Sequence, residues 1–466
     1  MSLSQENLKA KLDQLECHFT WELNKDDVDI QNLLNRLGEG VELDLGKEQG
    51  VARAHNFSGY VKFLLGDQKE ALSHLLESEA LLRKKFGDHC DKLLIVPYGN
   101  FAWVNYHMEN YTECEGYLQK IQEINENFPT MSVAEVLGEK GWTFLKFSHK
   151  YYERARDVLK KAVEMDPDNS EWNAGYAIAL YRTDTEPCTV DSPAVKQLRQ
   201  ALDIDPDDDV LKVHLGLRLL NCSKQLMKDS EKLVEEALNG SPDHPHVMRY
   251  VSMFFRDRGS VDRSIELLEK ALQNSPGSCF IHHQLALCYR TKKINLQKEK
   301  RDSAEVNEAC DKSIYHLEMA TSLKASFIIA MSELALQYGE RGDLFMAENL
   351  FEETFKIATE KKDNLNAVNF RYALYQQYSI RNEEQAINHY IQCLKTAPLS
   401  SEGTRSVHKL KKIAQNILRK NPDDWKGSKI MGLIFQERPD MCQDNSNTST
   451  EEADEVRNNL SEIMFF

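Results

Sequence analysis

Four similar segments decide the fold of this chain: AVEMDPDN (162–169), ALDIDPDD (201–208), ALNGSPDH (237–244) and ALQNSPGS (271–278). Each segment begins with an alanine and carries a proline five residues later, and successive prolines are 39, 36 and 34 residues apart. Proline ends a helix because it lacks the backbone N–H of the helical ladder, and a small residue one turn earlier lets another helix approach closely. The segments therefore predict helical hairpins that repeat along the chain with a period of about 34 residues.

Weaker copies of the pattern lie on both sides of these segments. Each reads as a helix, a short polar turn and a second helix, with apolar residues three and four positions apart. Helical hairpins of this length are typical of tetratricopeptide repeats. Such repeats bury their apolar faces only against neighbouring repeats, so we predict an all-α superhelix, or α-solenoid, with a concave lining. The weaker copies span 57–75, 101–118, 334–351 and 372–390.

The repeats divide the chain into five predicted parts. A charged insertion at 292–312 is expected to lengthen the helices of its repeat rather than to form a domain. The polar and acidic tail is predicted to be mostly disordered because it cannot bury enough apolar surface. The five parts are N-terminal helices (1–50), N-terminal repeats (51–135), central repeats that form a pocket (136–290), C-terminal repeats (291–440) and the tail (441–466).

Charge and composition limit the function. The 466 residues include 58 Lys and Arg against 74 Asp and Glu, a formal net charge of −16. This excludes a generic cationic coat for nucleic acid, so any such site must be a local basic pocket in an acidic protein. Ten cysteines are scattered singly, which favours reduced thiols. Because the sequence has no apolar signal-peptide core and no long apolar window, we expect a cytoplasmic protein without a membrane span.

Polar residues recur at equivalent positions of adjacent repeats. Placing 244–259 over 278–293 aligns residues 34 positions apart, which should form stacked rows on the inner wall. Converging arginines suit phosphate because each guanidinium presents a planar fork to two oxygens, and aromatic rings stack on unpaired bases. The aligned pairs are Arg249 with His283, Tyr250 with Gln284, and Arg256 with Arg290, while earlier repeats contribute Trp142, Lys146, Tyr152 and Arg182.

Other interpretations of these residues stay open at this point. The arginines can pair with Asp or Glu of neighbouring helices while the aromatic residues form core, and an acidic peptide is a further ligand for such a groove. Catalytic motifs are poor: neither HExxH nor GxSxG occurs, and His107 and Glu109 lack the paired cysteines of a zinc deaminase. We therefore predict no enzyme, no catalytic residue, no cofactor and no metal site.

Five motifs are more specific than the repeat pattern: LECHFTWEL (15–23), EKGWTFLKF (139–147), GYAIALYR (175–182), RYVSMFFRDRGSVDRSIELLEKAL (249–272) and HHQLALCYR (282–290). Together they resemble the interferon-induced proteins with tetratricopeptide repeats (IFIT), from about residue 5 to 435. The resemblance implies an all-helical, cytosolic, antiviral protein that is not an enzyme. It also implies that the repeats close around a central positively charged tunnel, which holds the 5′ end of single-stranded viral RNA and sequesters it from translation. That end bears a triphosphate or an incompletely methylated cap.

Matching positions imply roles for individual residues. The pocket for a cap base or first base is expected at Trp142 and Ile178, since a methylated guanine is cationic and a tryptophan face attracts it. The residues expected to bind 5′ phosphates are Arg36, Lys146, Arg182 and Arg249. The residues expected near the first nucleotides and along the RNA path are Tyr152, Tyr250, Arg256, His283, Gln284, Arg290 and Phe327.

Four positions depart from the family pattern. This chain has Gly40 where the family pattern has a glutamine, His246 where it has a tyrosine, and Met253 where it has a lysine. It has Lys324 where one relative carries an acidic residue that is associated with a metal. The change at Lys324 predicts that no such metal binds here. The other three substitutions support a second hypothesis: a non-catalytic scaffold for protein–protein interaction within an interferon-induced antiviral complex, with related repeat proteins as partners. The first hypothesis makes single-stranded RNA with a 5′-triphosphate or cap the partner, and neither expects DNA.

Overall fold

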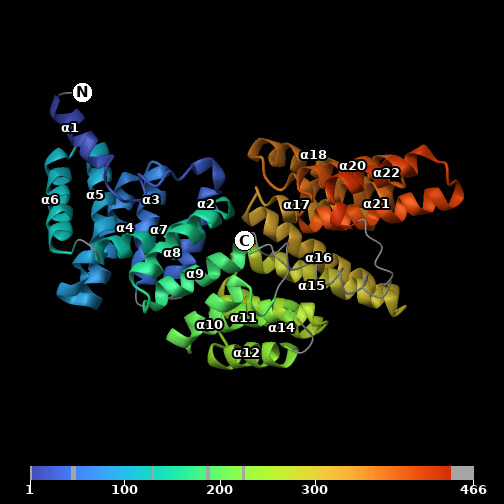
Figure 1. The fold of residues 1–466 in the computed structure, drawn as a ribbon, viewed down its shortest axis with the longest axis horizontal. Helices are drawn as coiled ribbons and strands as arrows, with labels where there is room; N and C mark the ends of the chain where they lie inside the picture. The colour runs from blue at the N-terminus through green and yellow to red at the C-terminus, as the bar shows by residue number, and fades with distance from the viewer. Residues whose placement is uncertain (1–2, 43–48, 129–130, 185–188, 223–225, 442–466) are drawn as a thin grey trace. The chain divides into compact units, whose positions relative to one another are not determined.

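The computed structural model describes residues 3–42, 49–128, 131–184, 189–222 and 226–441, and they fall into two compact units. Within these ranges the chain forms 22 α-helices and no strand, so the predicted all-α repeat fold is confirmed (Figure 1). The N-terminal unit (Met1–Pro242) contains α1 Leu3–Leu12, α2 Ile30–Glu42, α3 Gly50–Leu64, α4 Gln68–Phe86, α5 Ile95–His107, α6 Tyr111–Asn127, α7 Met131–Phe147, α8 Tyr152–Met165, α9 Ser170–Thr183, α10 Pro193–Ile204, α11 Asp209–Cys222 and α12 Met227–Gly240. The C-terminal unit (Asp243–Phe466) contains α13 Pro245–Asp257, α14 Val261–Asn274, α15 Cys279–Lys298, α16 Ser303–Leu323, α17 Ile328–Arg341, α18 Leu344–Lys361, α19 Leu365–Tyr375, α20 Glu383–Thr396, α21 Ser401–Lys420 and α22 Trp425–Glu437.

The repeated alanine and proline mark the ends of second helices. Helices α8, α10, α12 and α14 each end two residues before one of the four prolines. The first residue beyond each helix donates its backbone N–H to the alanine carbonyl, as Asp166 does to Ala162 at 3.0 Å. All four alanines are buried, so the contact between helices needs a side chain no larger than a methyl group. Each alanine–proline pair therefore marks both the end of a helix and the place where that helix contacts its neighbour.

The weaker copies also form hairpins: α3 with α4, α5 with α6, α17 with α18, and α19 with α20. The charged insertion 292–312 lies in the last turns of α15, the turn after it and the first half of α16. The boundary between the two compact units, after Pro242, falls inside the block predicted for 136–290. The chain is described as far as a short turn, Pro439–Met441, so the predicted tail lies outside the described residues apart from its first residue.

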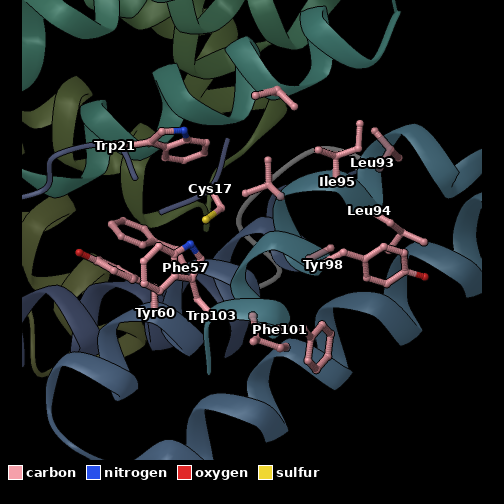
Figure 2. Close-up of a cluster of buried hydrophobic side chains, with 14 of the residues drawn as sticks. Cys17, Trp21, Phe57, Tyr60, Leu93, Leu94, Ile95, Tyr98, Phe101 and Trp103 are labelled. Atoms are coloured by element: carbon pink, nitrogen blue, oxygen red, sulfur yellow. The ribbon is translucent and has the colours of Figure 1, made fainter. Parts of the chain in front are cut away.

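Aromatic residues build the core of the N-terminal unit (Figure 2). The ring of Phe19 stacks on Trp103 with centroids 5.5 Å apart, and His18 stacks on Phe57 at 4.9 Å. Cys17 is fully buried here, and burial raises the pKa of its thiol to about 12. Every cysteine whose surroundings are described, in either unit, is a buried free thiol. These cysteines therefore act as small apolar side chains rather than as metal ligands or a disulfide framework.

Two glycines bring helices close together beside the predicted pocket. A Cβ atom at Gly138 of α7 would lie 2.4 Å from the Trp172 ring of α9. At Gly175 of α9 it would lie 3.1 Å from the ring of Trp142. Larger residues at either position would push α7 and α9 apart, because neither indole has space to retreat. The absence of side chains at these glycines thus sets the distance at which the two tryptophans lie.

Candidate functional site

Two helices of the N-terminal unit carry residues at matching positions, each set beginning with a glutamate and ending with a cation. Helix α7 carries Glu135, Glu139, Trp142 and Lys146, which follow one another at intervals of four, three and four residues. This spacing places them on one face of the helix. Helix α9 repeats the intervals with Glu171, Gly175, Ile178 and Arg182. The predicted pocket residues are therefore the C-terminal halves of two rows that begin with glutamates.

Three predicted cations meet at the C-terminal end of α7. Arg36 donates to the backbone oxygen of Lys146 at 3.1 Å, and Arg182 donates to the backbone oxygen of Leu145 at 3.1 Å. Arg182 also bonds the Tyr152 hydroxyl at 3.0 Å and lies over its ring, 4.8 Å from the centroid. The last carbonyls of a helix carry partial negative charge, which attracts guanidinium groups. The structure thus brings Arg36, Lys146, Arg182 and Tyr152 together.

Lys146 is the most perturbed cation of this group. Its side chain is largely buried, and within the described ranges its ammonium makes no hydrogen bond or ion pair. Burial, followed by the nearby charges of Arg53 and Arg36, lowers the pKa of Lys146 to about 8, although Glu171 opposes the shift. An ammonium in this state gains stability from an added anion. The chemistry of the group therefore suits a phosphate.

Trp142 and Ile178 are half-buried side chains next to this cluster. The indole N–H of Trp142 is buried and has no hydrogen-bond partner within the described part of the chain. The guanidinium carbon of Arg53 lies 5.9 Å from the Trp142 ring centroid. Ile178 packs against hydrophobic clusters on both sides of α9. The two residues expected at the base pocket are therefore an indole with a cation beside it and an aliphatic side chain.

Sequence reasoning missed Arg53, Glu139 and Glu171. Arg53 of α3 forms a largely buried ion pair with Glu171 of α9, and it also donates to the side-chain oxygen of Gln49 at 3.1 Å. Glu139 accepts a 2.6 Å hydrogen bond from Asn56, and burial raises its pKa to about 7. The sequence contained one signal for the two glutamates. Glu139 precedes Lys146 by seven residues and Glu171 precedes Ile178 by seven, so each glutamate shares a helix face with a predicted site residue.

A small pocket opens beside Arg53, with space for about one water molecule. Its charged lining residues are Arg53, Lys92, Glu135 and Glu139, and Lys92 pairs with Glu135 at 2.8 Å. Burial raises the pKa of Glu135, and it raises the pKa of Glu139 to about 7. Near neutral pH the Glu139 carboxyl is therefore protonated for part of the time.

In the C-terminal unit, Arg249 of α13 lies among aromatic rings. Its guanidinium carbon is 4.7 Å from the Tyr250 ring and 4.5 Å from the Phe280 ring. One guanidinium nitrogen lies 2.8 Å from Nδ1 of His246. Arg249 therefore lies between two aromatic rings and the imidazole of His246.

The two adjacent first helices meet through two predicted path residues that are 28, not 34, positions apart. Arg256 of α13 donates to the side-chain oxygen of Gln284 of α15 at 2.6 Å. Arg256 is buried, with its Nε 3.4 Å from Asp257. His283 is also buried, and its ring lies 5.0 Å from Phe327. These predicted path residues thus belong to the packed interior of the unit.

Arg290 pairs with carboxylates, which is the alternative that the sequence analysis left open. It lies 3.2 Å from Glu333 and 3.7 Å from Glu340, both on α17. Arg371 of α19 binds the other oxygen of Glu333 at 2.7 Å and is itself fully buried. Burial alone would raise the pKa of Glu333, but Arg371 and then Arg290 hold it well below its usual range. Arg290 is therefore part of an internal ion-pair network.

Of the other positions expected to depart from the family pattern, Met253 and Lys324 have described surroundings, and those of Gly40 lie outside the description. Met253 is a buried core side chain of α13, and the Lys324 ammonium lies 5.1 Å from the Phe327 ring centroid. Across the described ranges, no cluster of three or more His, Cys, Asp or Glu is arranged to hold a metal ion. In the same ranges, no helix combines the length and apolarity needed to cross a membrane.

Comparisons with known proteins agree with the repeat fold and identify the family. The family model for the tetratricopeptide repeat matches residues 136–169. The chain is 34% identical over 444 residues to the human antiviral innate immune response effector IFIT1, covering 92% of each chain. It is 31% identical over 450 residues to human interferon-induced protein with tetratricopeptide repeats 2, covering 94% of each.

Solved structures of the first relative have the same fold. The human IFIT1 dimer with PPP-AAAA matches with a TM-score of 0.79 at 34% identity, over 93% of this chain and 96% of that one. The human IFIT1 dimer with m7Gppp-AAAA matches with a TM-score of 0.81 at 32% identity, over 98% and 99%. With this identity over nearly its whole length, the chain belongs to the family of interferon-induced proteins with tetratricopeptide repeats.

Proposed function

We propose that this protein captures the 5′ end of single-stranded RNA, bearing a triphosphate or an incompletely methylated cap. In this proposal it is a non-catalytic antiviral effector that acts in the cytoplasm by withholding bound RNA from translation. Related human structures contain PPP-AAAA and m7Gppp-AAAA, which supports RNA as the ligand of the shared fold. The acidic body of the protein repels nucleic acid in general, so recognition concentrates on the end of the strand.

One observation carries the proposal: Lys146, a partly buried cation, lies beside two arginines. Arg36 and Arg182 are held at the carbonyls beside it, and its own pKa is lowered to about 8. A triphosphate would supply the negative charge that this arrangement favours. Each charge-assisted hydrogen bond to phosphate contributes about 1.5–3 kcal/mol, so a few of them outweigh the repulsion of the distant acidic surface.

The other candidate residues take roles that follow from their chemistry. Tyr152, held by Arg182, offers a ring at the phosphate cluster, and Trp142 with Ile178 lines the pocket for the first base or the cap. Arg249 is the phosphate-binding candidate of the C-terminal unit. The family resemblance implies an RNA path in that unit, but the residues it names there are buried or, in Arg290, paired with carboxylates, so the proposal does not rest on them. They are Tyr250, Arg256, His283, Gln284, Arg290 and Phe327.

The decisive experiment compares one RNA before and after phosphatase treatment in a gel shift with the full chain. Binding that disappears with the 5′ phosphates supports capture of the end. Equal binding of both forms contradicts the proposal, as does absence of binding to the triphosphate form.

A charge reversal tests the site itself. Arg182→Glu is expected to weaken binding of triphosphate RNA more than tenfold, because it places a carboxylate at the end of α7. Arg156→Glu is the matched control: it makes the same charge change on α8, where Arg156 pairs only with its sequence neighbours Glu153 and Asp157 among the ion pairs of the described chain. Equal affinities of the two variants would contradict the assignment of Arg182.

A second candidate function is a docking scaffold for related repeat proteins. It is favoured by the outer face of α22, where Trp425 and Phe435 are 71% and 65% exposed. Large apolar side chains that stay exposed on the last described helix are typical of interaction surfaces. The scaffold alone predicts no effect of phosphatase on RNA binding, so the same gel shift separates the two functions.

A further inference from the structure

We propose that Arg53 makes this chain select an uncapped 5′-triphosphate end over a methylguanosine-capped end. The inference rests on the proposed function and concerns the pocket beside Trp142. Arg53 was not among the residues that the family resemblance pointed to. Its position follows from contacts within the N-terminal unit alone.

Arg53 is fixed beside the indole expected at the base pocket. Its guanidinium carbon lies 5.9 Å from the Trp142 ring centroid and 5.7 Å from that of Trp172, which is fully buried. Glu171 binds it in a largely buried ion pair, and Gln49 accepts a hydrogen bond from it. With partners on several sides, the side chain has little freedom to leave the tryptophans.

A methylguanosine cap needs a tryptophan face beside which Arg53 already lies. The methylated base is cationic, so it gains from lying over such a face. The guanidinium of Arg53 lies 5.9 Å from the Trp142 ring centroid and would repel a second cation there. The charge of Arg53 therefore opposes the methylated base at this ring.

The same charge favours an uncapped triphosphate. Arg53 is the strongest of the neighbouring charges that lower the pKa of Lys146, so its field reaches the phosphate cluster. An uncapped end carries an additional ionisable oxygen on its terminal phosphate, whereas a cap replaces that oxygen with an ester and adds a positive base. Positive potential at Lys146 therefore stabilises the uncapped end more than the capped one.

The test measures the affinities of three RNAs that differ only at the 5′ end: triphosphate, unmethylated guanosine cap and methylguanosine cap. Fluorescence anisotropy with the full wild-type chain is expected to give at least a tenfold preference for the triphosphate over the methylated cap. Arg53→Gln keeps a hydrogen-bond donor for Glu171 but removes the charge. It is expected to reduce the preference to threefold or less, mainly by strengthening binding of the methylated cap.

Controls separate selectivity from damage to the fold. Arg156→Gln removes one arginine from the exposed side of α8 and is expected to keep the wild-type preference. If Arg53→Gln leaves Glu171 as a buried unpaired charge and loses helical content, the double variant Arg53→Gln with Glu171→Gln removes both charges and carries the same expectation. A general loss of structure would weaken all three RNAs together and would leave their ratio unchanged.

The outcomes also separate this inference from the proposed function. Equal binding of triphosphate and methylated-cap RNA by the wild-type chain overturns the role of Arg53 but leaves 5′-end capture in place. An unchanged preference in the folded Arg53 variants overturns it in the same way. Failure of the wild-type chain to bind any of the three RNAs in a phosphate-dependent manner contradicts the proposed function itself.

Discussion

The two units place arginines in opposite surroundings. In the N-terminal unit, Arg36 and Arg182 donate to carbonyls at the end of α7, beside an ammonium whose pKa is lowered to about 8. In the C-terminal unit, Arg290 and Arg371 converge on one buried carboxylate, Glu333, and lower its pKa. The first arrangement holds cations close together, and binding of an anion would lower their free energy. In the second arrangement, a carboxylate of the protein already neutralises the charge of the arginines. We infer that the first serves binding and the second serves stability.

Glu333→Ala should produce the largest effect, and it should be an effect on stability. The substitution leaves Arg371 buried without its closest carboxylate, and breaking a buried ion pair in this way costs about 3–5 kcal/mol. Chemical denaturation followed by circular dichroism measures it. Glu352→Ala, on the exposed face of α18, is the control and should change the free energy of unfolding by no more than about 0.5 kcal/mol. A loss below about 1 kcal/mol for Glu333→Ala would contradict the structural role of the network.

Lys146→Met should show the reverse pattern. We expect binding of triphosphate RNA to weaken about 10- to 100-fold, because the variant loses a charge-assisted interaction with phosphate. The folded protein should become about 1 kcal/mol more stable at pH 7, because a pKa lowered by burial means that the charged lysine opposes folding. Anisotropy and denaturation give the two values. If Lys146→Met is both less stable and unimpaired in binding, the two units do not differ as we argue.

The sequence predicted the helices that carry both groups of arginines, but it did not predict that the arginines have different partners in the two units. The alanine–proline pairs located the ends of α8, α10, α12 and α14, because both signals act within one helical turn. The weaker copies located the hairpins of α3 with α4, α5 with α6, α17 with α18 and α19 with α20, because apolar residues recur in each at helical spacing. Both are local or periodic rules, and a single sequence contains them in full.

The sequence analysis did not predict the ion pairs between residues that are far apart in the chain. Arg290 meets Glu333 from 43 residues away, and Arg53 meets Glu171 from 118 residues away. Register alone therefore treated Arg290 as a wall residue of the same kind as Arg182. The choice between a carbonyl and a carboxylate partner depends on how neighbouring hairpins pack, which no spacing within one repeat encodes.

Alkaline pH should weaken RNA binding through Lys146. Its pKa of about 8 means that the free protein loses this positive charge as the pH rises through 8, and phosphate binds the charged form. Affinity for triphosphate RNA should therefore fall about three- to tenfold between pH 7.5 and 9, with proton uptake on binding. Lys146→Arg, whose charge persists throughout, should remove most of this dependence. A flat wild-type profile over this range would contradict the link between Lys146 and phosphate.

The smallest effect concerns a histidine pair in the C-terminal unit and should appear in stability alone. Nδ1 of His282 lies 3.0 Å from Nδ1 of His316, so at least one ring must be neutral to accept the hydrogen bond. Burial, then the charges of His282 and Lys312, lowers the pKa of His316 to about 4. The unfolded chain therefore binds more protons below about pH 6.5, and stability falls as the pH drops from there toward 4.

His316→Asn keeps a hydrogen-bonding group beside His282 and removes this titration. The wild-type chain should lose about 0.5–1 kcal/mol more than the variant between pH 7.5 and 6, measured by denaturation at each pH. His89→Asn, at an exposed position of the N-terminal unit, is the control and should follow the wild-type profile. Binding of triphosphate RNA should keep the same pH dependence in His316→Asn and wild type, because Lys146 governs it. A shift of the binding profile with His316→Asn would show that the interior of the C-terminal unit takes part in recognition, and the division of roles between the units would fail.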